Sequence, residues 1–234
     1  MKKRQEKKII FDTGPIITLS LNNLLWILEP LKEKANARFL ITPAIKYELV
    51  DRPLKIKRFK FEAMQTMQYI RNSTLEIMKD EEAKPLAEEL LEISNSILTA
   101  RGKNIKIVHY AEMEAVALAI TRKADAVIID ERTLRMLIED PEKLKSIMQH
   151  RLKTKITVNR TSLNSFMQKV KGIRFLRSVE LVTVAFEMKL LDRYLPRIPR
   201  ARENLLDSVL WGVKLNGCSV SNREIQRIKK MEIK

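Results

Sequence analysis

Residues 8–17 read Lys-Ile-Ile-Phe-Asp-Thr-Gly-Pro-Ile-Ile, and this stretch decides the fold. The apolar run at 8–11 predicts a short buried strand. Thr13-Gly14-Pro15 predicts the end of that strand, because glycine and proline interrupt regular structure. An apolar helix is expected over 16–28. The strand therefore presents Asp12 at its carboxyl end.

The same alternation of short strands and helices continues along the chain. Further strands are expected at 38–41, 74–78, 126–129 and 155–158. Between them, helical patterns cover 42–50, 58–70, 83–100, 111–122, 131–138 and 141–150. This order predicts an α/β fold, a three-layer α/β/α sandwich with a mostly parallel five-stranded sheet.

After residue 160 the pattern is helical throughout. We expect helices at 161–171, 174–191, 203–215 and 221–230. We therefore divide the chain into an α/β domain over 1–160 and a basic, helical C-terminal extension over 161–234.

The chain is strongly basic, with 45 Lys and Arg against 29 Asp and Glu and a net charge of +16. Residues 1–150 hold 26 basic and 22 acidic side chains, a net of +4, whereas 151–234 hold 19 and 7, a net of +12. Such an imbalance favours a polyanionic partner, either RNA, DNA or an anionic surface. The candidate nucleic-acid contacts are Arg132, Arg174, Arg177, Arg197, Arg200 and Arg202.

Histidine and cysteine are scarce. One cysteine, Cys218, excludes an intramolecular disulfide and a multi-cysteine zinc site, and two histidines exclude a His-rich metal centre. The apolar run before Asp12 is too short for a signal-peptide core, and no run approaches the length of a membrane span. We therefore expect a soluble, cytoplasmic protein without a membrane partner, whose chemistry rests on carboxylates.

Carboxylates follow the expected strands. Asp12 ends the first strand, Asp130 ends the fourth, and Glu48 follows the second, while Glu112 and Glu114 precede the fourth. The carboxyl ends of parallel strands share one edge of a sheet, where ligand sites form. Converging carboxylates repel one another unless a cation lies between them, and oxygen-only ligands suit Mg²⁺ or Mn²⁺. The alternative for Asp12 is a structural role as the cap of the next turn.

Four motifs, in this order, resemble those of PIN-domain nucleases. They lie at 9–17, 42–49, 111–119 and 124–132, and the resemblance covers roughly 7–160. The third motif, Ala-Glu-Met-Glu-Ala, is similar to the Gly-Glu-x-Glu-Ala version found in a prokaryotic, VapC-like subgroup, with Ala111 in the place of glycine. The stretch over 52–106 is longer than in minimal members of the family.

The resemblance implies a site that cleaves RNA, or sometimes DNA, with Mg²⁺ or Mn²⁺. It implies that the metal-binding carboxylates are Asp12, Glu48, Glu112 and Asp130, with the Thr13 hydroxyl as an assistant to metal or water. Glu114 competes with Glu112 for the third role. Because residues two apart do not share a helix face, only one of them can point into the site, and the spacing favours Glu112.

The resemblance also leaves the biological role open between two kinds of ribonuclease. One is the toxin of a toxin–antitoxin pair, with a small acidic antitoxin-like partner, and the other is an RNA-processing enzyme. Homodimerisation is implied by the family. Two alternatives stand beside the endoribonuclease: a non-catalytic RNA-binding or scaffold protein on the same fold, and a DNA nuclease.

Overall fold

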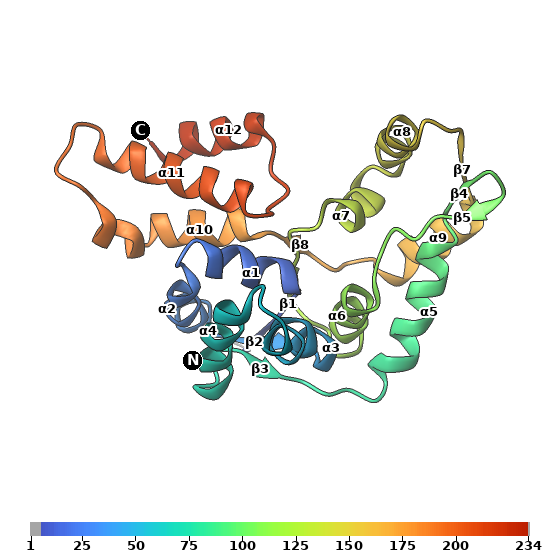
Figure 1. Ribbon diagram of the computed structural model, residues 1–234, viewed down its shortest axis with the longest axis horizontal. Coiled ribbons are helices and arrows are strands. Elements are labelled where there is room, and N and C mark those ends of the chain that lie inside the picture. Colours follow the sequence, from blue (N-terminus) through green and yellow to red (C-terminus); the bar gives the residue numbers. More distant parts are fainter. Residues whose placement is uncertain (1–5, 234) are drawn as a thin grey trace, which may run out of the picture.

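The computed structural model describes residues 6–233, and its centre is a five-stranded, fully parallel sheet (Figure 1). The strand order is β3-β2-β1-β6-β8. The strands are β1 (Lys7–Phe11), β2 (Ala37–Ile41), β3 (Glu76–Ile77), β6 (Ala126–Ile128) and β8 (Phe175–Leu176). This confirms the predicted α/β fold with a mostly parallel sheet.

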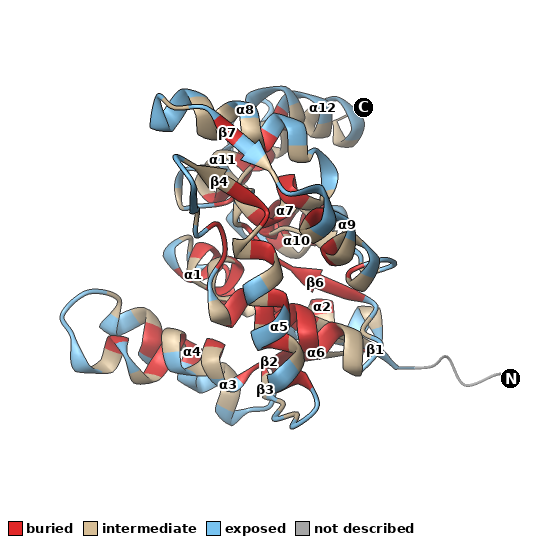
Figure 2. Ribbon diagram, turned by 90° about the vertical axis from the view of Figure 1, so that its right-hand side faces the viewer, coloured by how far each residue is buried: buried red, intermediate tan, exposed pale blue. Residues whose placement is uncertain are grey.

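Helices flank the sheet and complete the layers. Helix α6 packs against β1 and β6, and α2 packs against β2. The helices of this part are α1 (Thr13–Leu21), α2 (Leu28–Ala35), α3 (Pro43–Lys46), α4 (Lys60–Arg71), α5 (Ala83–Asn95) and α6 (Tyr110–Thr121). Figure 2 shows the buried strand residues at the centre, with exposed helix faces turned outward.

The core explains why the first strand lies in the middle of the sheet. Ile10 and Phe11 are fully buried, and the Phe11 ring lies 4.9 Å from the ring of Phe39 on β2. Parallel strands covered on both faces read as nearly continuous apolar runs, as residues 9–11 do. The apolar pattern therefore matches the position of β1 at the centre of the sheet, where both of its faces are covered.

One predicted strand lies elsewhere. The segment at 155–158 forms β7 (Ile156–Val158), but β7 pairs antiparallel with β4 (Leu98–Ala100) in a separate small sheet that also holds β5 (Lys103–Asn104). The fifth place in the main sheet belongs to β8. With only two residues, β8 is too short to give an alternating pattern in the sequence. Because β8 occupies the start of the helix expected at 174–191, that helix begins only at Ser178.

Three helix predictions need correction. The helix expected at 83–100 ends at Asn95, whose side-chain Oδ1 accepts from the Ile107 N–H at 2.7 Å. The helix expected at 16–28 ends at Leu21, and Asn23 adopts a positive φ of 55° before a 3₁₀ turn. The helix expected at 42–50 changes after α3 into a π-helical segment, Tyr47–Asp51.

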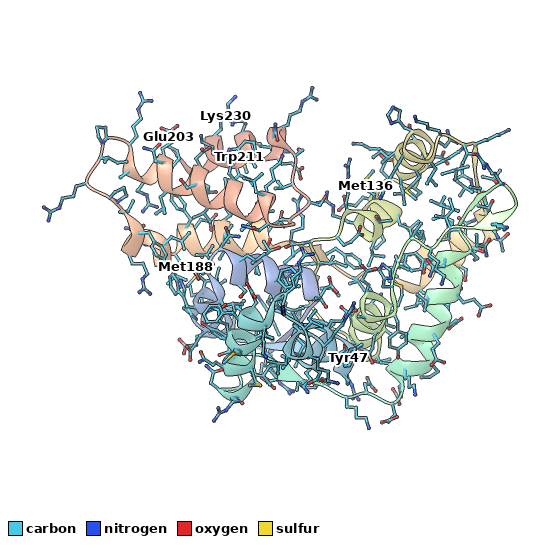
Figure 3. All side chains as sticks on the ribbon, viewed as in Figure 1. Tyr47, Met136, Met188, Glu203, Trp211 and Lys230 are labelled. Carbon is cyan, nitrogen blue, oxygen red and sulfur yellow. The ribbon has the colours of Figure 1, made fainter. Side chains whose placement is uncertain are left out.

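The remaining helices form two groups in Figure 1. One group contains α7 (Arg132–Glu139), α8 (Pro141–Leu152) and α9 (Arg160–Lys169). The other contains α10 (Ser178–Glu187), α11 (Ala201–Leu215) and α12 (Asn222–Glu232), with a 3₁₀ turn at Leu190–Tyr194. Figure 3 shows side chains filling the space between α11 and α12, where Trp211 is labelled.

The C-terminal extension is tied to the main sheet. The Val127 N–H donates to the Arg174 carbonyl, and the Ile129 N–H donates to the Leu176 carbonyl, each at 2.8 Å. Helix α10 then packs against α1 and α11. Among the described residues, no helix combines the length and the apolar character needed to cross a membrane.

Candidate active site and metal centre

Asp12 and Asp130 follow two neighbouring strands at the same edge of the sheet. Phe11 on β1 is in register with Ile128 on β6, and the Asp12 N–H donates to the Ile128 carbonyl at 2.9 Å. The chain crosses from β1 to β2 on one side and reaches β6 on the other, so this is the point where strand order reverses. In open parallel sheets, ligands bind outside the strand ends at this point.

Gly14 lies between the two aspartates. A Cβ atom at Gly14 would lie 3.4 Å from Asp130 Cβ and 3.5 Å from Asp12 Oδ2. Asp12 is 5% exposed and Asp130 is 2% exposed. The two acids therefore border one small buried space that no side chain of residue 14 fills.

Asp12 has the capping role that was the alternative considered from the sequence, and its environment is unusual for a cap. Its Oδ2 accepts from the Gly14 N–H at 3.3 Å and so caps α1. The pKa of Asp12 is raised from 3.8 to about 7, chiefly by burial. The carboxylates of Glu48 and Asp130 contribute to the rise, and hydrogen bonds from the Thr13 and Gly14 N–H groups oppose it. A capping carboxylate in water has no such shift, so this side chain is held in a place where its negative charge is unfavourable.

Glu48 reaches the site from the π-helical segment. Its Oε2 accepts a hydrogen bond from the Thr13 hydroxyl at 2.7 Å. Its charge also contributes to the raised pKa of both Asp12 and Glu112. Short π-helical turns are rare and are often found at functional sites.

Glu112 and Glu114 point to different places. Glu112 is 9% exposed, and burial raises its pKa from 4.5 to about 8, followed by the effect of the Asp12 carboxylate. One Glu112 oxygen accepts from the His109 N–H at 3.0 Å, at the start of α6. The Glu114 carboxylate instead accepts from the Ala44 N–H at 3.0 Å, at the start of α3. The structure thus brings Glu112, and not Glu114, into electrostatic contact with Asp12.

Asp130 is held by a residue that sequence reasoning missed. The Ser178 N–H donates to Asp130 Oδ1, and the Ser178 hydroxyl donates to Asp130 Oδ2, each at 2.8 Å. The Ser219 N–H donates to the Asp130 carbonyl at 3.1 Å. In the sequence, Ser178 falls inside an expected helix, and no signal there marks it as the start of a helix that follows a strand.

The chemistry of the candidate ligands suits a hard cation. All candidate ligands are carboxylate oxygens, and two of them carry raised pKa values that a cation would lower. Within residues 6–233, no three His, Cys, Asp or Glu side chains come close enough together to enclose a metal ion. Mg²⁺ often uses only one or two carboxylates and completes its coordination with water and substrate phosphates. The residues present therefore fit a water-rich Mg²⁺ or Mn²⁺ site better than a closed cage.

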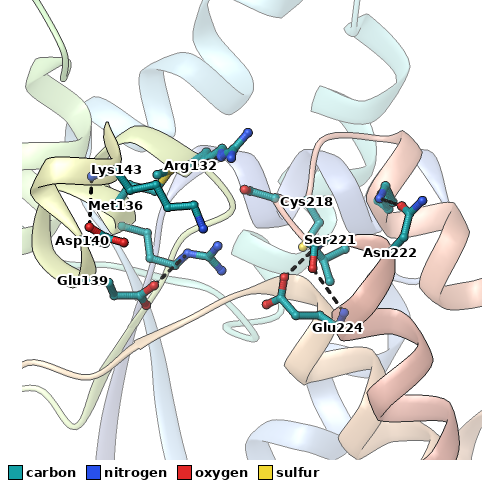
Figure 4. Close-up of a pocket in the computed structure, with 13 residues that line it drawn as sticks. Arg132, Met136, Glu139, Asp140, Lys143, Cys218, Ser221, Asn222 and Glu224 are labelled. Atoms are coloured by element: carbon teal, nitrogen blue, oxygen red, sulfur yellow. Dashed lines mark hydrogen bonds and ion pairs between the residues drawn. The ribbon is translucent and has the colours of Figure 1, made fainter. Parts of the chain in front are cut away.

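A cavity of about 700 Å³ opens beside this site, between α7–α8 and the segment joining α11 to α12 (Figure 4). Its cationic lining residues are Arg132, Arg135, Lys143 and Lys214. Its acidic lining residues have partners: Glu139 pairs with Arg135 at 3.5 Å, Asp140 accepts from the Lys143 N–H, and Glu224 pairs with Arg177. Ser219, which contacts Asp130, also lines this cavity. Asp12 and Asp130 do not line the cavity, but Ser219 connects its wall to the Asp130 backbone, and the wall carries cations.

The other arginines expected to contact nucleic acid differ in their environments. The Arg177 side chain is 12% exposed and bonds to Glu180, Glu224 and the Ser219 carbonyl. Arg202 pairs with Asp192 at 2.8 Å and lies over the Phe186 ring. Three are exposed: Arg174, Arg197 and Arg200. The last two belong to the turn before α11, at the end of α10 that is remote from β8 (Figure 1).

Comparison with known families agrees with this geometry. A family model described as PIN domain matches residues 8–142. The chain belongs to the PIN-domain family. PIN domains are generally nucleases and generally use divalent metals, so family membership supports a nuclease. The matched residues include all four carboxylates of the predicted PIN site, and Ser178 lies outside them.

Two further comparisons were made for this PIN-domain chain. No curated protein matches it. Among solved structures, it is similar to VapBC2 from Rickettsia felis, determined bound to a DNA fragment from the promoter of its genes. The identity is 14% and the TM-score 0.41, over 73% of this chain and 98% of the other.

Proposed function

We propose that this chain is an endoribonuclease that hydrolyses RNA phosphodiester bonds with Mg²⁺ or Mn²⁺. The observation that carries the proposal is the placement of Asp12 and Asp130 after β1 and β6 at one edge of the sheet, with a buried Glu112 whose pKa the Asp12 carboxylate helps to raise. The proposed metal-binding side chains are Asp12, Glu48, Glu112 and Asp130. Glu114 is left out because its carboxylate caps α3.

The reaction adds water across one P–O ester bond. The water oxygen attacks phosphorus in line, one P–O bond breaks, and the leaving oxygen takes up a proton. A bound divalent ion supplies a more acidic water and stabilises charge on the phosphate. The chain's own contribution would be to shield Asp12, Glu112 and Asp130 from bulk water, while the Thr13 hydroxyl orients the half-buried Glu48.

RNA would be held by cations on both sides of the aspartates. Arg132 lies at the start of α7, two residues after Asp130, and lines the cavity described above. Arg174 is exposed just before β8. Arg197 and Arg200 are exposed at the far end of the extension and would contact a longer RNA, while Arg202 is partly occupied by Asp192. Binding through phosphates predicts a steep loss of affinity with salt.

Two biological roles and two assemblies are proposed from the resemblance to VapC-like nucleases. The roles are a toxin held by an acidic antitoxin-like partner and an RNA-processing nuclease. The assemblies are a homodimer and a complex with that partner. The extension over 161–234 holds 15 basic and 7 acidic side chains, a net of +8, and this charge suits an acidic partner as well as RNA.

The test is a cleavage assay on end-labelled single-stranded RNA, structured RNA and DNA, with Mg²⁺, Mn²⁺ or EDTA. We expect RNA cleavage that EDTA abolishes and that Asp12→Asn and Asp130→Asn each reduce by at least about 100-fold. Cleavage of DNA alone would replace RNA by DNA as the substrate. RNA binding without cleavage under any metal would favour the scaffold function, and activity that survives both substitutions would refute the assigned site.

A further inference from the structure

Asp130 differs from the other candidate carboxylates in having both oxygens fixed by one residue. The Ser178 N–H and the Ser178 hydroxyl each donate at 2.8 Å, one to each carboxylate oxygen. Ser178 is fully buried and Asp130 is 2% exposed, so water does not compete for these two bonds. A carboxylate that accepts a hydrogen bond at each oxygen is held in one plane and one orientation.

Three features hold Ser178 in this place. Strand β8 pairs with β6 just before it, through the Ile129 N–H and the Leu176 carbonyl. Helix α10 begins at Ser178, so its N-terminal dipole also favours a negative charge at Asp130. Arg177 bonds to Glu224 and to the Ser219 carbonyl, and Ser219 in turn donates to the Asp130 carbonyl. Ser178 at the start of α10 and Ser219 after α11 therefore both contact Asp130, and Arg177 links them to each other and to α12.

We propose that Ser178 is a positioning residue for Asp130, through which the C-terminal extension completes the active site. The inference rests on the proposed function, because it assigns Ser178 a part in the same reaction. Each carboxylate oxygen offers two lone-pair sites, so each hydrogen bond from Ser178 occupies only one of the two. The bonds therefore orient Asp130 without using up its capacity to bind.

This assignment changes the view of the extension that its charge suggested. The sequence indicates a basic appendage that holds RNA or a partner. The contacts of Ser178 and Ser219 instead place two extension residues directly on a predicted metal ligand. Residues that orient a metal ligand in this way typically change metal affinity or activity by 10–100-fold when removed.

The experiment compares Ser178→Ala with the wild-type chain and with Thr183→Ala. Thr183 lies on the same helix, but its hydroxyl donates to the Val179 carbonyl and does not contact the site. The readouts are the Mn²⁺ affinity by calorimetry, kcat and KM for RNA, and the thermal midpoint. We expect Ser178→Ala to weaken Mn²⁺ binding and lower kcat by about 10–100-fold with little change in KM. Thr183→Ala should match the wild type.

A second pair separates the hydroxyl from packing. Ser178→Thr keeps the hydroxyl, and Ser178→Val has nearly the same volume as the threonine variant but no hydroxyl. Only the threonine variant should therefore retain Mn²⁺ affinity and kcat. This pair decides the matter if the alanine variant does not fold. A lower thermal midpoint with unchanged Mn²⁺ affinity and kcat, or a faster enzyme after Ser178→Ala, overturns the proposal. A wild-type chain that neither binds Mn²⁺ nor cleaves RNA refutes the proposed function instead.

Discussion

The Thr13 hydroxyl donates a 2.7 Å hydrogen bond to Oε2 of Glu48. This bond joins the first turn of α1 to the π-helical segment after α3, across 35 positions of sequence. Because Glu48 is only half-buried, its side chain has room to adopt other rotamers. The Thr13 hydroxyl therefore selects one orientation of Glu48, next to Asp12.

Removing this hydroxyl tests that role. Thr13→Val keeps the volume of the side chain but leaves Glu48 without its donor, so we expect the RNA cleavage rate to fall by about 10-fold. Thr13→Ser keeps the donor and should retain most of the activity. Single-turnover cleavage at saturating Mn²⁺ measures the difference. Equal rates for the valine and serine variants would show that the Thr13–Glu48 hydrogen bond does not orient a group that cleavage needs.

The two glutamates on α6 give a matched pair of variants. Glu112 is buried with Asp12, whereas the Glu114 carboxylate accepts from the Ala44 N–H. Glu112→Gln removes a charge from the site and should weaken Mn²⁺ binding by at least about 10-fold. Glu114→Gln can still accept from Ala44 and should bind Mn²⁺ like the wild type. The reverse order of affinities in a calorimetric titration would assign the metal to Glu114.

The buried acids also predict how the stability of the metal-free protein depends on pH. The pKa rises from 3.8 to about 7 for Asp12 and from 4.5 to about 8 for Glu112 on folding. The folded state then binds protons more tightly than the unfolded state, so the free energy of unfolding falls as the pH rises between about 4 and about 8. Burial and repulsion between neighbouring carboxylates raise these pKa values. The resulting loss of unfolding free energy is of the order of a few kcal/mol.

Urea denaturation in EDTA at pH 5.5 and pH 8.5 measures this effect. Glu224, Glu76 and Asp80 have lowered pKa values, so their contributions to stability are lost only below about pH 4 and stay constant in this range. Asp12→Asn should reduce the difference between the two pH values, since the amide does not titrate. A metal-free chain that is more stable at pH 8.5 than at pH 5.5, with no change in Asp12→Asn, would contradict the assignment.

Arg177 and the exposed arginines should respond differently to substitution. The Arg177 side chain is 12% exposed, and its loss would remove the guanidinium that bonds to Glu180, Glu224 and the Ser219 carbonyl. We expect Arg177→Met to lower the free energy of unfolding by about 2–4 kcal/mol. Arg197→Ala with Arg200→Ala should leave stability nearly unchanged. The measurement is urea unfolding of each variant.

In RNA binding, unlike in stability, we expect the double variant to be affected and the Arg177 variant not. The Arg197 and Arg200 double variant should lower RNA affinity and flatten its salt dependence, because two phosphate contacts are lost. A folded Arg177→Met variant should keep the salt dependence of the wild type. Identical salt slopes for the double variant and the wild type would remove Arg197 and Arg200 from the RNA interface.

Much of the fold could be predicted from the sequence because buried parallel strands leave a clear apolar signal. The last three residues of β1 and all three residues of β6 are apolar, and the aspartate that follows each strand marks its end. This signal was enough to bring Asp12 and Asp130 to one edge. The two-residue strand β8 has no such pattern, and its pairing with β6 depends on where the preceding helices bring the chain.

The parts of the site that could not be predicted depend on side-chain direction. Spacing on a helix shows that Glu112 and Glu114 diverge, but only the packing of α6 against α3 shows that Glu114 reaches the Ala44 N–H at the start of α3. Ser178 is 48 positions from Asp130, and serine is common at helix starts. Its link to Asp130 therefore appears only when β8 is placed beside β6.

The central claim is that the buried carboxylates around Asp12 bind a divalent cation, and calorimetry of Mn²⁺ binding at pH 7 tests it most directly. Asp12 has a pKa of about 7 in the metal-free protein, so an ion that binds there must displace protons. We predict Mn²⁺ binding with proton release, detected by repeating the titration in buffers with different ionisation enthalpies. Asp12→Asn should weaken binding at least about 10-fold and reduce the release, whereas Asp51→Asn, which changes a surface partner of Lys46, should do neither. Absence of Mn²⁺ binding, or equal affinity and proton release in wild type and Asp12→Asn, would contradict the account.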